Sequence, residues 1–144
     1  HGLILAVCTY QQESQMVSKD LKMLNVLEEV SGLGIKLILM HAGGIRFLEF
    51  YDFSKSRPNI LLDLSFTLRR YQSTSIIHEV VKILSKSPHN LAFGSDFPDY
   101  NMLDYSECIN KLRSSVLSKA SLSMLTHQNA INFLGIDSEV FEGA

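Results

Sequence analysis

The sequence predicts an α/β fold built on a parallel β-sheet. Four short apolar runs alternate along the chain with longer stretches whose apolar residues recur at helical spacing. Parallel strands require long crossover connections, and the helices between the strands supply them. Two of the runs end in loops that combine glycine with histidine or aspartate, at residues 41–44 and 94–98. Because α/β proteins place their chemistry at such strand ends, these loops are the first candidates for a functional site.

The first half of the chain predicts two strands, each followed by a helix. The expected elements are a strand at residues 3–8, a helix at 16–31, a strand at 35–40 and a helix at 45–53. Both strands are short, nearly continuous apolar runs, as in strands buried on both faces. The first helix shows Leu21, Leu24 and Leu27 at helical spacing and ends near Gly34. Pro58 prevents the second helix from continuing.

The second half repeats this alternation and then becomes helical. The expected elements are a strand at residues 59–64, a helix at 75–85, a strand at 91–93 and helices at 105–118 and 122–134. The helix at 75–85 carries Ile76, Val80 and Ile83 on one side, and Pro88 lies beyond its end. Gly135 is the expected C-cap of the last helix.

The composition indicates one domain and excludes two classes of partner. A chain of 144 residues with 46% hydrophobic content can bury a core of single-domain size. The net charge is −2, and no run of Lys or Arg is longer than Arg69-Arg70, so nothing indicates binding to nucleic acid or to an anionic membrane. The apolar runs are too short to cross a bilayer. Binding to polyanions and membrane spanning are therefore not expected.

The cysteines and the first residues bear on the setting of the protein. Cys8 and Cys108 lie in separate apolar segments, which favours neither a disulfide framework nor a zinc knuckle and indicates a reducing, cytoplasmic location. The chain opens on His1 and enters the first strand without the charged and apolar regions of a signal peptide. We expect this opening to be a cut through a larger protein.

A parallel sheet of this kind has two possible architectures. It can be open and doubly wound, or it can be half of an eight-stranded barrel, since 144 residues fall well short of the ~250 that a whole barrel needs. A half barrel would leave the strands at residues 3–8 and 91–93 unpaired at their outer edges unless another segment covers them, and we would then expect self-association.

Four segments together resemble a known family. They are Leu-Met-His-Ala-Gly-Gly at residues 39–44, Ile-Leu-Leu-Asp-Leu-Ser at 60–65, Phe-Gly-Ser-Asp-Phe-Pro at 93–98 and Asn-Ala-Ile-Asn-Phe-Leu-Gly at 129–135. Their sequence and order are similar to the later half of the amidohydrolase superfamily, in the amidohydrolase-2 branch of metal-dependent hydrolases that includes aminocarboxymuconate-semialdehyde decarboxylase. The resemblance implies one partial domain over residues 1–144: the C-terminal half, strands five to eight, of a TIM (β/α)8 barrel plus terminal helices.

The resemblance also implies a divalent metal, usually zinc, at the mouth of the barrel. In the family a His-x-His pair on strand one, a His on strand five and an Asp on strand eight hold this metal. Asp96 matches the strand-eight aspartate, and His41 matches the strand-six histidine that contacts the metal-bound water or the substrate. A metal lowers the pKa of bound water to about 7, and a carboxylate beside it can accept the proton. We expect Asp96 to be metal ligand and catalytic base and His41 to be catalytic; the alternatives are a structural histidine and a turn cap before Pro98.

Two ligand positions depart from the family pattern. No two histidines of this chain are two residues apart, so the His-x-His pair is absent. Cys8 stands where the family has the strand-five histidine, and a thiolate binds zinc well. Cys8 is therefore a candidate metal ligand, although a buried free cysteine is more often an inert apolar residue.

Three further residues are candidates for substrate binding. Backbone N–H groups at Gly43 and Gly44 could hold a carboxylate or phosphate, although a tight turn that needs glycine explains them equally well. Arg69 could pair with an acidic substrate, and the alternative is a solvated surface arginine. Asp63 lies inside a predicted strand and is expected to be structural.

These observations leave hypotheses from different classes open. The leading one is a metal-dependent hydrolase that uses metal-activated water on a small carboxylate, amide or lactone-like substrate, or a related non-oxidative decarboxylase. The second is a catalytically degenerate family member that binds a ligand or a partner. A flavodoxin-like binding domain is a third, but no glycine-rich phosphate fingerprint follows the first strand. Because ligands are missing, we expect the chain alone to be inactive unless a second copy or a missing N-terminal half completes the site.

Overall fold

The strands form one parallel sheet in sequence order, as predicted. The computed structural model describes residues 2–10, 20–115 and 117–137. The sheet has the order β1-β2-β3-β4, and every pair of neighbours is parallel. Its strands are β1 (Ile4–Cys8), β2 (Lys36–Met40), β3 (Ile60–Asp63) and β4 (Leu91–Ala92). Each strand lies within one of the four predicted apolar runs.

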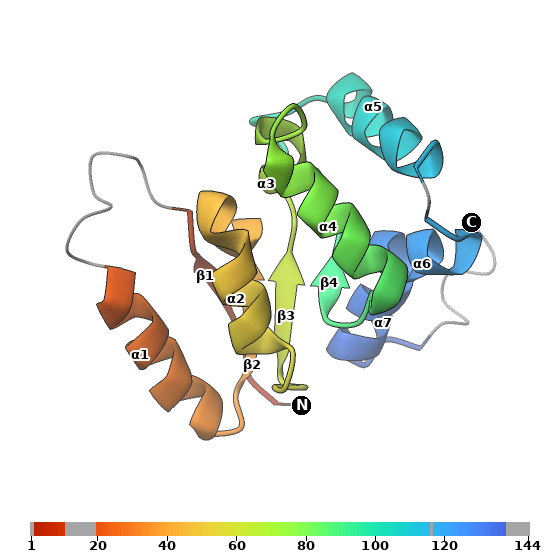
Figure 1. Cartoon of the computed structure of the whole chain (residues 1–144). Helices are drawn as coiled ribbons and strands as arrows, with labels where there is room; N and C mark the ends of the chain where they lie inside the picture. The colour runs from red at the N-terminus through yellow and green to blue at the C-terminus, as the bar shows by residue number, and fades with distance from the viewer. Residues whose placement is uncertain (1, 11–19, 116, 138–144) are drawn as a thin grey trace.

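The helices follow the strands in the predicted alternation (Figure 1). They are α1 (Asp20–Gly32), α2 (Phe47–Ser54), α3 (Thr67–Arg70), α4 (Ser75–Lys86), α5 (Met102–Arg113), α6 (Lys119–Ser123) and α7 (Asn129–Leu134), with a 3-10 segment η2 (His41–Arg46) and a π-helical segment η3 (Met124–Gln128). Residues 16–19 of the first predicted helix lie outside the described residues. Gly135 takes the left-handed conformation and caps α7, as expected.

Two helix boundaries differ from the prediction for identifiable reasons. The helix expected at 105–118 begins at Met102 because Asn101 and Asp104 form a capping box at its start, and it ends at Arg113. The helix expected at 122–134 is a run of α6, η3 and α7, which begins at Lys119 behind the Ser118 cap.

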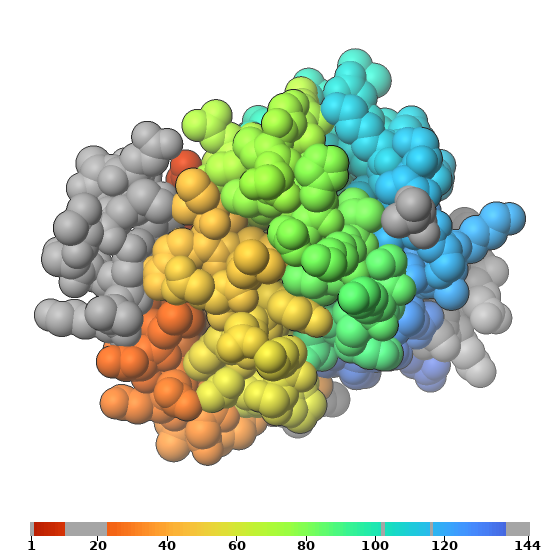
Figure 2. Space-filling model, in the orientation of Figure 1, coloured from red at the N-terminus to blue at the C-terminus, as the bar shows by residue number. Residues whose placement is uncertain are grey.

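The crossover helices cover one face of the sheet. The main core contains residues of α1, α2 and α4 packed on the strand residues that alternate toward them. Its fully buried strand members are Leu37, Leu39, Ile60, Leu62 and Leu91. In the space-filling view α2 and α4 lie side by side (Figure 2), and the cartoon shows them in front of the sheet (Figure 1). A doubly wound sheet carries helices on both faces, whereas the strands of a barrel have their crossover helices on one side, so this layout corresponds to part of a barrel.

The other face of the sheet is sparsely covered. Leu61 and Ala92 form a small cluster there with Phe133 of α7, and Ile38 packs against it. On β1, Cys8 is exposed, so the alternative of an inert buried cysteine is wrong within the described residues. Cys8 lies at the end of β1, the outermost strand of the sheet among the described residues, in register with Met40.

The two outer edges of the sheet differ. At β4, the Phe93 N–H donates to the Leu125 carbonyl at 2.8 Å, and Asn129 Nδ2 donates to the Leu91 carbonyl at 2.8 Å. These are the groups that a further strand would use, because Asn90 and Ala92 accept bonds from β3. Leu125 and Asn129 therefore cover the edge at residues 91–93, which is the exception that the expectation allowed, whereas β1 is an edge strand among the described residues. No helix in the described part of the chain is long and apolar enough to span a bilayer.

Candidate functional site

The structure brings His41 and Asp96 together at the carboxyl ends of the strands. His41 follows β2 directly, and Asp96 lies four residues beyond the end of β4. The His41 Nδ1 atom is 3.7 Å from Asp96 Oδ1, and the two side chains are 12% and 11% exposed. The parallel arrangement accounts for this contact, because it places the ends of β2, β3 and β4 on one rim.

The β3 end adds two polar side chains between them. Ser65 Oγ donates to Asp63 Oδ2 at 2.6 Å, and the Ser65 N–H donates to Asp63 Oδ1 at 2.9 Å. The same Ser65 Oγ is 3.2 Å from His41 Nδ1, and the Ser65 carbonyl is 3.3 Å from it. The sequence analysis did not single out Ser65, although it directly follows the strand predicted at 59–64 and lies two residues beyond the end of β3.

Backbone conformation is unusual at all three strand ends. His41, Phe66 and Asp96 have φ angles of 65°, 63° and 59°. Positive φ is uncommon for any residue other than glycine and costs free energy unless the surroundings hold it. Such residues cluster at functional sites, and here at least one lies after each of β2, β3 and β4; Ala42 and Asn90 also have positive φ.

The glycine loop is packed more tightly than expected. The Gly43 N–H donates to Thr9 Oγ1 at 2.7 Å, and Thr9 Oγ1 in turn donates to the Met40 carbonyl. A Cβ on Gly43 would lie 2.1 Å from the Phe50 ring, and Gly43 and Gly44 are both buried. The expectation of a free N–H at Gly43 was therefore wrong: the group is used inside the protein. Backbone sterics account for Gly43, as the turn alternative required.

Of the other candidates, Arg69 is paired with a carboxylate of α5 and Cys8 is exposed. Both Nε and Nη2 of Arg69 donate to Asp104 Oδ1 of α5, at 3.1 and 2.8 Å, and this pairing raises the pKa of the guanidinium. Cys8 is exposed at the end of β1. Within the described ranges, no group of three His, Cys, Asp or Glu side chains is placed to hold a metal ion.

Asp96 has the electrostatic character of a reactive group. Burial raises the pKa of its carboxyl above the ordinary value of 3.8, although the neighbouring His41 lowers it and Asp99 and Asp63 raise it further. Its Oδ2 atom is buried and has no hydrogen-bond partner in the described part of the chain. A buried carboxylate oxygen without a partner is costly and calls for a ligand, a proton or a metal ion.

Aromatic rings enclose the histidine on one side. Tyr10 and Phe66 pack edge to face with ring centroids 4.4 Å apart, and the His41 ring lies 5.6 Å from Phe66. Tyr100 extends this group at 6.0 Å from Phe66, and burial raises the pKa of its phenol. None of these rings was singled out from the sequence. Their positions, one to four residues beyond a strand end or a candidate residue, were the available signal.

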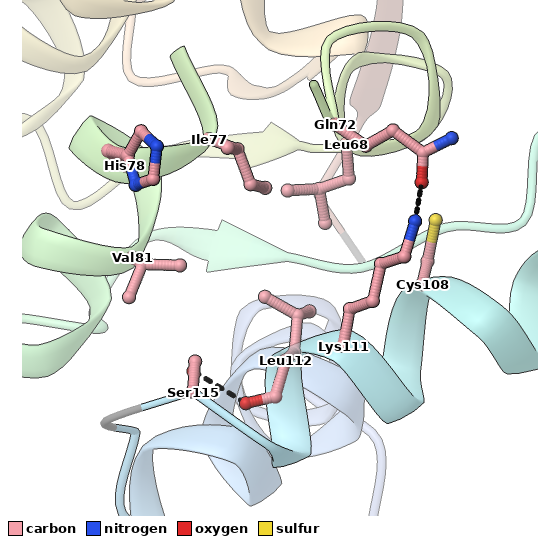
Figure 3. Close-up of a pocket in the computed structure, with 9 residues that line it drawn as sticks. All are labelled: Leu68, Gln72, Ile77, His78, Val81, Cys108, Lys111, Leu112 and Ser115. Carbon is pink, nitrogen blue, oxygen red and sulfur yellow. Dashed lines mark hydrogen bonds between the residues drawn. The ribbon is translucent and has the colours of Figure 1, made fainter. Parts of the chain in front are cut away.

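A separate pocket lies between α3, α4 and α5 (Figure 3). It has a volume of about 370 Å³ and an apolar lining that includes Leu68, Val81 and Leu112. Lys111 Nζ at its rim donates to Gln72 Oε1 at 2.5 Å. The pocket includes neither His41 nor Asp96, so it is distinct from the site at the strand ends.

Comparison with known proteins supports the fold. No family model and no curated protein matches the sequence. Among solved structures, the chain is similar to the crystal structure of an amidohydrolase from Burkholderia multivorans with bound zinc, at a TM-score of 0.58 and 20% identity. The match covers 81% of this chain and 50% of that protein, so this chain spans about half the length of its structural neighbour. The likeness shows that the chain has the fold of part of an amidohydrolase.

Proposed function

We propose that this chain is the C-terminal half, strands five to eight, of a metal-dependent hydrolase of amidohydrolase type. Its substrate class would be a small carboxylate, amide or lactone, and a related non-oxidative decarboxylation is the neighbouring possibility. The observation that carries the proposal is the contact between His41 and the buried, partly unpartnered Asp96 on the strand-end rim. The zinc bound by the structural neighbour supports it.

The chain's own residues fit a metal only in part. The unpartnered Oδ2 of Asp96 suits a single metal-ligand bond. Zinc sites in enzymes use three protein ligands, and the described residues offer no such group. The remaining ligands must therefore come from outside the described residues, as a barrel completed by further strands would provide. A divalent metal bound there would supply Lewis-acid activation of water.

Asp96 and His41 have distinct tasks in this proposal. The raised pKa of Asp96 makes its carboxylate a stronger base, suited to accept the proton that an attacking water loses. His41 is held at its Nδ1 side by Ser65, so its ring is fixed in orientation and its Nε2 atom can accept a hydrogen bond from the attacking water. The rings of Tyr10 and Phe66 restrict water on one side of the imidazole.

One observation favours a second candidate function. The exposed Cys8 at the strand-five position and the absence of a three-ligand group within the described residues suit a degenerate family member that binds a ligand or partner. In that case Asp96 would take up a proton or a cationic ligand group in place of a metal.

Metal analysis separates the two functions. We expect one equivalent of zinc in the protein purified from its natural source at its natural length, and a substoichiometric amount in residues 1–144 alone. Asp96→Asn at natural length should reduce the zinc content and lower hydrolysis of small lactones and esters by about a hundredfold or more. Asp52→Asn, which alters an exposed carboxylate on α2 that pairs with Lys55, is the control and should leave both unchanged.

Two results would contradict the proposal. Absence of any divalent metal from the natural-length protein would support the degenerate binding protein. Full zinc occupancy and turnover by residues 1–144 alone would show that this chain already completes a site, against the ligand count given above.

A further inference from the structure

We propose that Ser65 and Asp63 are positioning residues that fix the proton of the neutral His41 ring on Nδ1. The nitrogen Nε2 then carries the lone pair that accepts a proton or a hydrogen bond. The tautomer follows from the hydrogen-bond geometry alone, whereas its use in catalysis rests on the proposed function.

The first step concerns the direction of the Ser65 hydroxyl. A serine hydroxyl has one hydrogen, and Ser65 Oγ directs it to Asp63 Oδ2 at 2.6 Å. The second Asp63 oxygen is held by the Ser65 N–H, so the carboxylate is fixed on both sides. Ser65 Oγ can therefore present only a lone pair to His41 Nδ1, which lies 3.2 Å away.

The second step concerns the other neighbours of Nδ1. The Ser65 carbonyl oxygen lies 3.3 Å away and can only accept a hydrogen bond. Asp96 Oδ1 lies 3.7 Å away and carries no donor when ionised. Three acceptors thus surround Nδ1, and an unprotonated Nδ1 would face all of them with its own lone pair. Protonation at Nδ1 is the arrangement that satisfies the group.

The third step concerns the space around the hydrogen-bonded chain from Asp63 through Ser65 to His41, which is called the relay below. A Cβ on Gly94 would lie 2.7 Å from Asp63 Oδ1 and 3.0 Å from Ser65 Cβ. Gly94 thus allows β4 to pass close to the Asp63–Ser65 pair. Thr67 Oγ1 also donates to the His41 carbonyl, which anchors the histidine backbone to the segment that follows β3. The close fit of Gly94 and the anchored backbone hold the relay in one geometry.

Nitrogen NMR of histidine-labelled protein tests the tautomer directly. Spectra are recorded with a chelator present, at a pH at which imidazole is neutral, and the His41 signals are assigned by their loss in His41→Gln. We expect the Nδ1–H form to dominate. Asp63→Asn should reverse the relay, because its amide donates to Ser65 Oγ and turns the serine proton toward Nδ1. We expect the tautomer ratio to shift by about tenfold toward Nε2–H.

Two further variants make the test specific. Ser65→Ala removes the hydroxyl but keeps the carbonyl acceptor, and should move the ratio in the same direction by less. Ser123→Ala removes the serine hydroxyl 3.2 Å from Nε2 of the exposed His127 and should leave His41 unchanged. Circular dichroism confirms that each variant is folded, and if Asp63→Asn fails to fold, Ser65→Ala alone decides.

The outcomes are separable from those of the metal analysis. An Nε2–H ring in the unmodified protein, or an unchanged ratio in every folded relay variant, would overturn the proposal whatever the zinc content. A dominant Nδ1–H form in a protein that never binds metal would support the relay and reject the proposed function. Within an active enzyme, Ser65→Ala should lower kcat more than KM, because it disturbs orientation and not binding.

Discussion

The two outer strands of the sheet differ in whether the backbone groups on their outer side are hydrogen-bonded. β4 has its outward groups bonded by Leu125 and Asn129, which follow it in the chain. Among the described residues, β1 has no neighbouring strand on its outer side, and Leu5 in it is 42% exposed. An uncovered strand edge is a template for pairing with another chain, whereas a capped edge is not.

Because of this difference, a further strand could pair with β1 but not with β4 in the observed arrangement. A symmetric pair of half barrels would need β1 of each copy to meet β4 of the other, and the helical segment at β4 stands in that place. Closure at β4 would require the segment from η3 to α7 to move. Closure at β1 needs no rearrangement within the described residues.

Substitution of Asn129, which bonds the outer edge of β4, is expected to have the largest effect on stability. Asn129 Nδ2 donates hydrogen bonds to the carbonyls of both Pro88 and Leu91, and Asn129 is buried. Asn129→Ala leaves both carbonyls without this donor, which should lower the free energy of unfolding by about 2–3 kcal/mol in a urea titration. Asn132→Ala on the same helix is the control, since Asn132 is exposed and bonds only the Gln128 side chain. Equal losses in both variants would show that the edge contact is unimportant.

Substitution of Asp96, which lies beyond β4, is expected to have an intermediate effect on stability. The folded-state pKa of Asp96 is raised, so the folded protein binds this proton more tightly than the unfolded chain does. The stability from this group is present below the ordinary pKa of 3.8 and is lost as the pH rises through the raised folded value. Asp96→Asn should therefore be more stable than the unmodified protein at pH 7, by about 1 kcal/mol, in metal-free buffer.

The pH dependence of that difference is the decisive measurement. Thermal unfolding of both proteins should show the gain of Asp96→Asn shrinking toward zero as the pH falls below the ordinary carboxyl range. A gain that is independent of pH, or a loss of stability at pH 7, would contradict the assignment of Asp96 as a buried carboxylate with an unpartnered oxygen.

The open edge gives the smallest effect on stability and a separate effect on association. Leu5→Lys places a charge on exposed β1, so the free energy of unfolding should change by less than about 0.5 kcal/mol. Concentration-dependent self-association in sedimentation velocity should decrease, because a lysine disfavours strand pairing. Leu33→Lys, at a position 74% exposed and outside the sheet, controls for added charge and should leave association as it was. Equal association of all three proteins would indicate that β1 is not the contact.

The sequence was sufficient to predict the strands and the proximity of His41 and Asp96. Short apolar runs bounded by glycine and proline placed all four strands, and parallel order then placed His41 and Asp96 on one rim. Contacts between segments far apart in the sequence could not be predicted from it. The bonds from Asn129 to β4 and from Arg69 to Asp104 join residues 38 and 35 apart, and no local pattern specifies such partners.

Some missed features did have local signals. The Asn101 and Asp104 spacing is a capping box that marks the start of α5 three residues earlier than the apolar pattern suggested. Ser65 lies at a strand end, where the other site residues were sought. The left-handed conformation of Phe66 had no signal, because nothing in a phenylalanine favours it.

The left-handed residues at the three strand ends limit how this site can be redesigned. His41 and Asp96 are residue types that tolerate positive φ, so a substitution library at these positions should be drawn from Gly, Asn, Asp and His. Val, Ile and Thr would be rejected there for steric reasons before any change of chemistry was tested. Phe66 is the exception, and replacing it with glycine would relieve the backbone while opening the aromatic wall beside the imidazole.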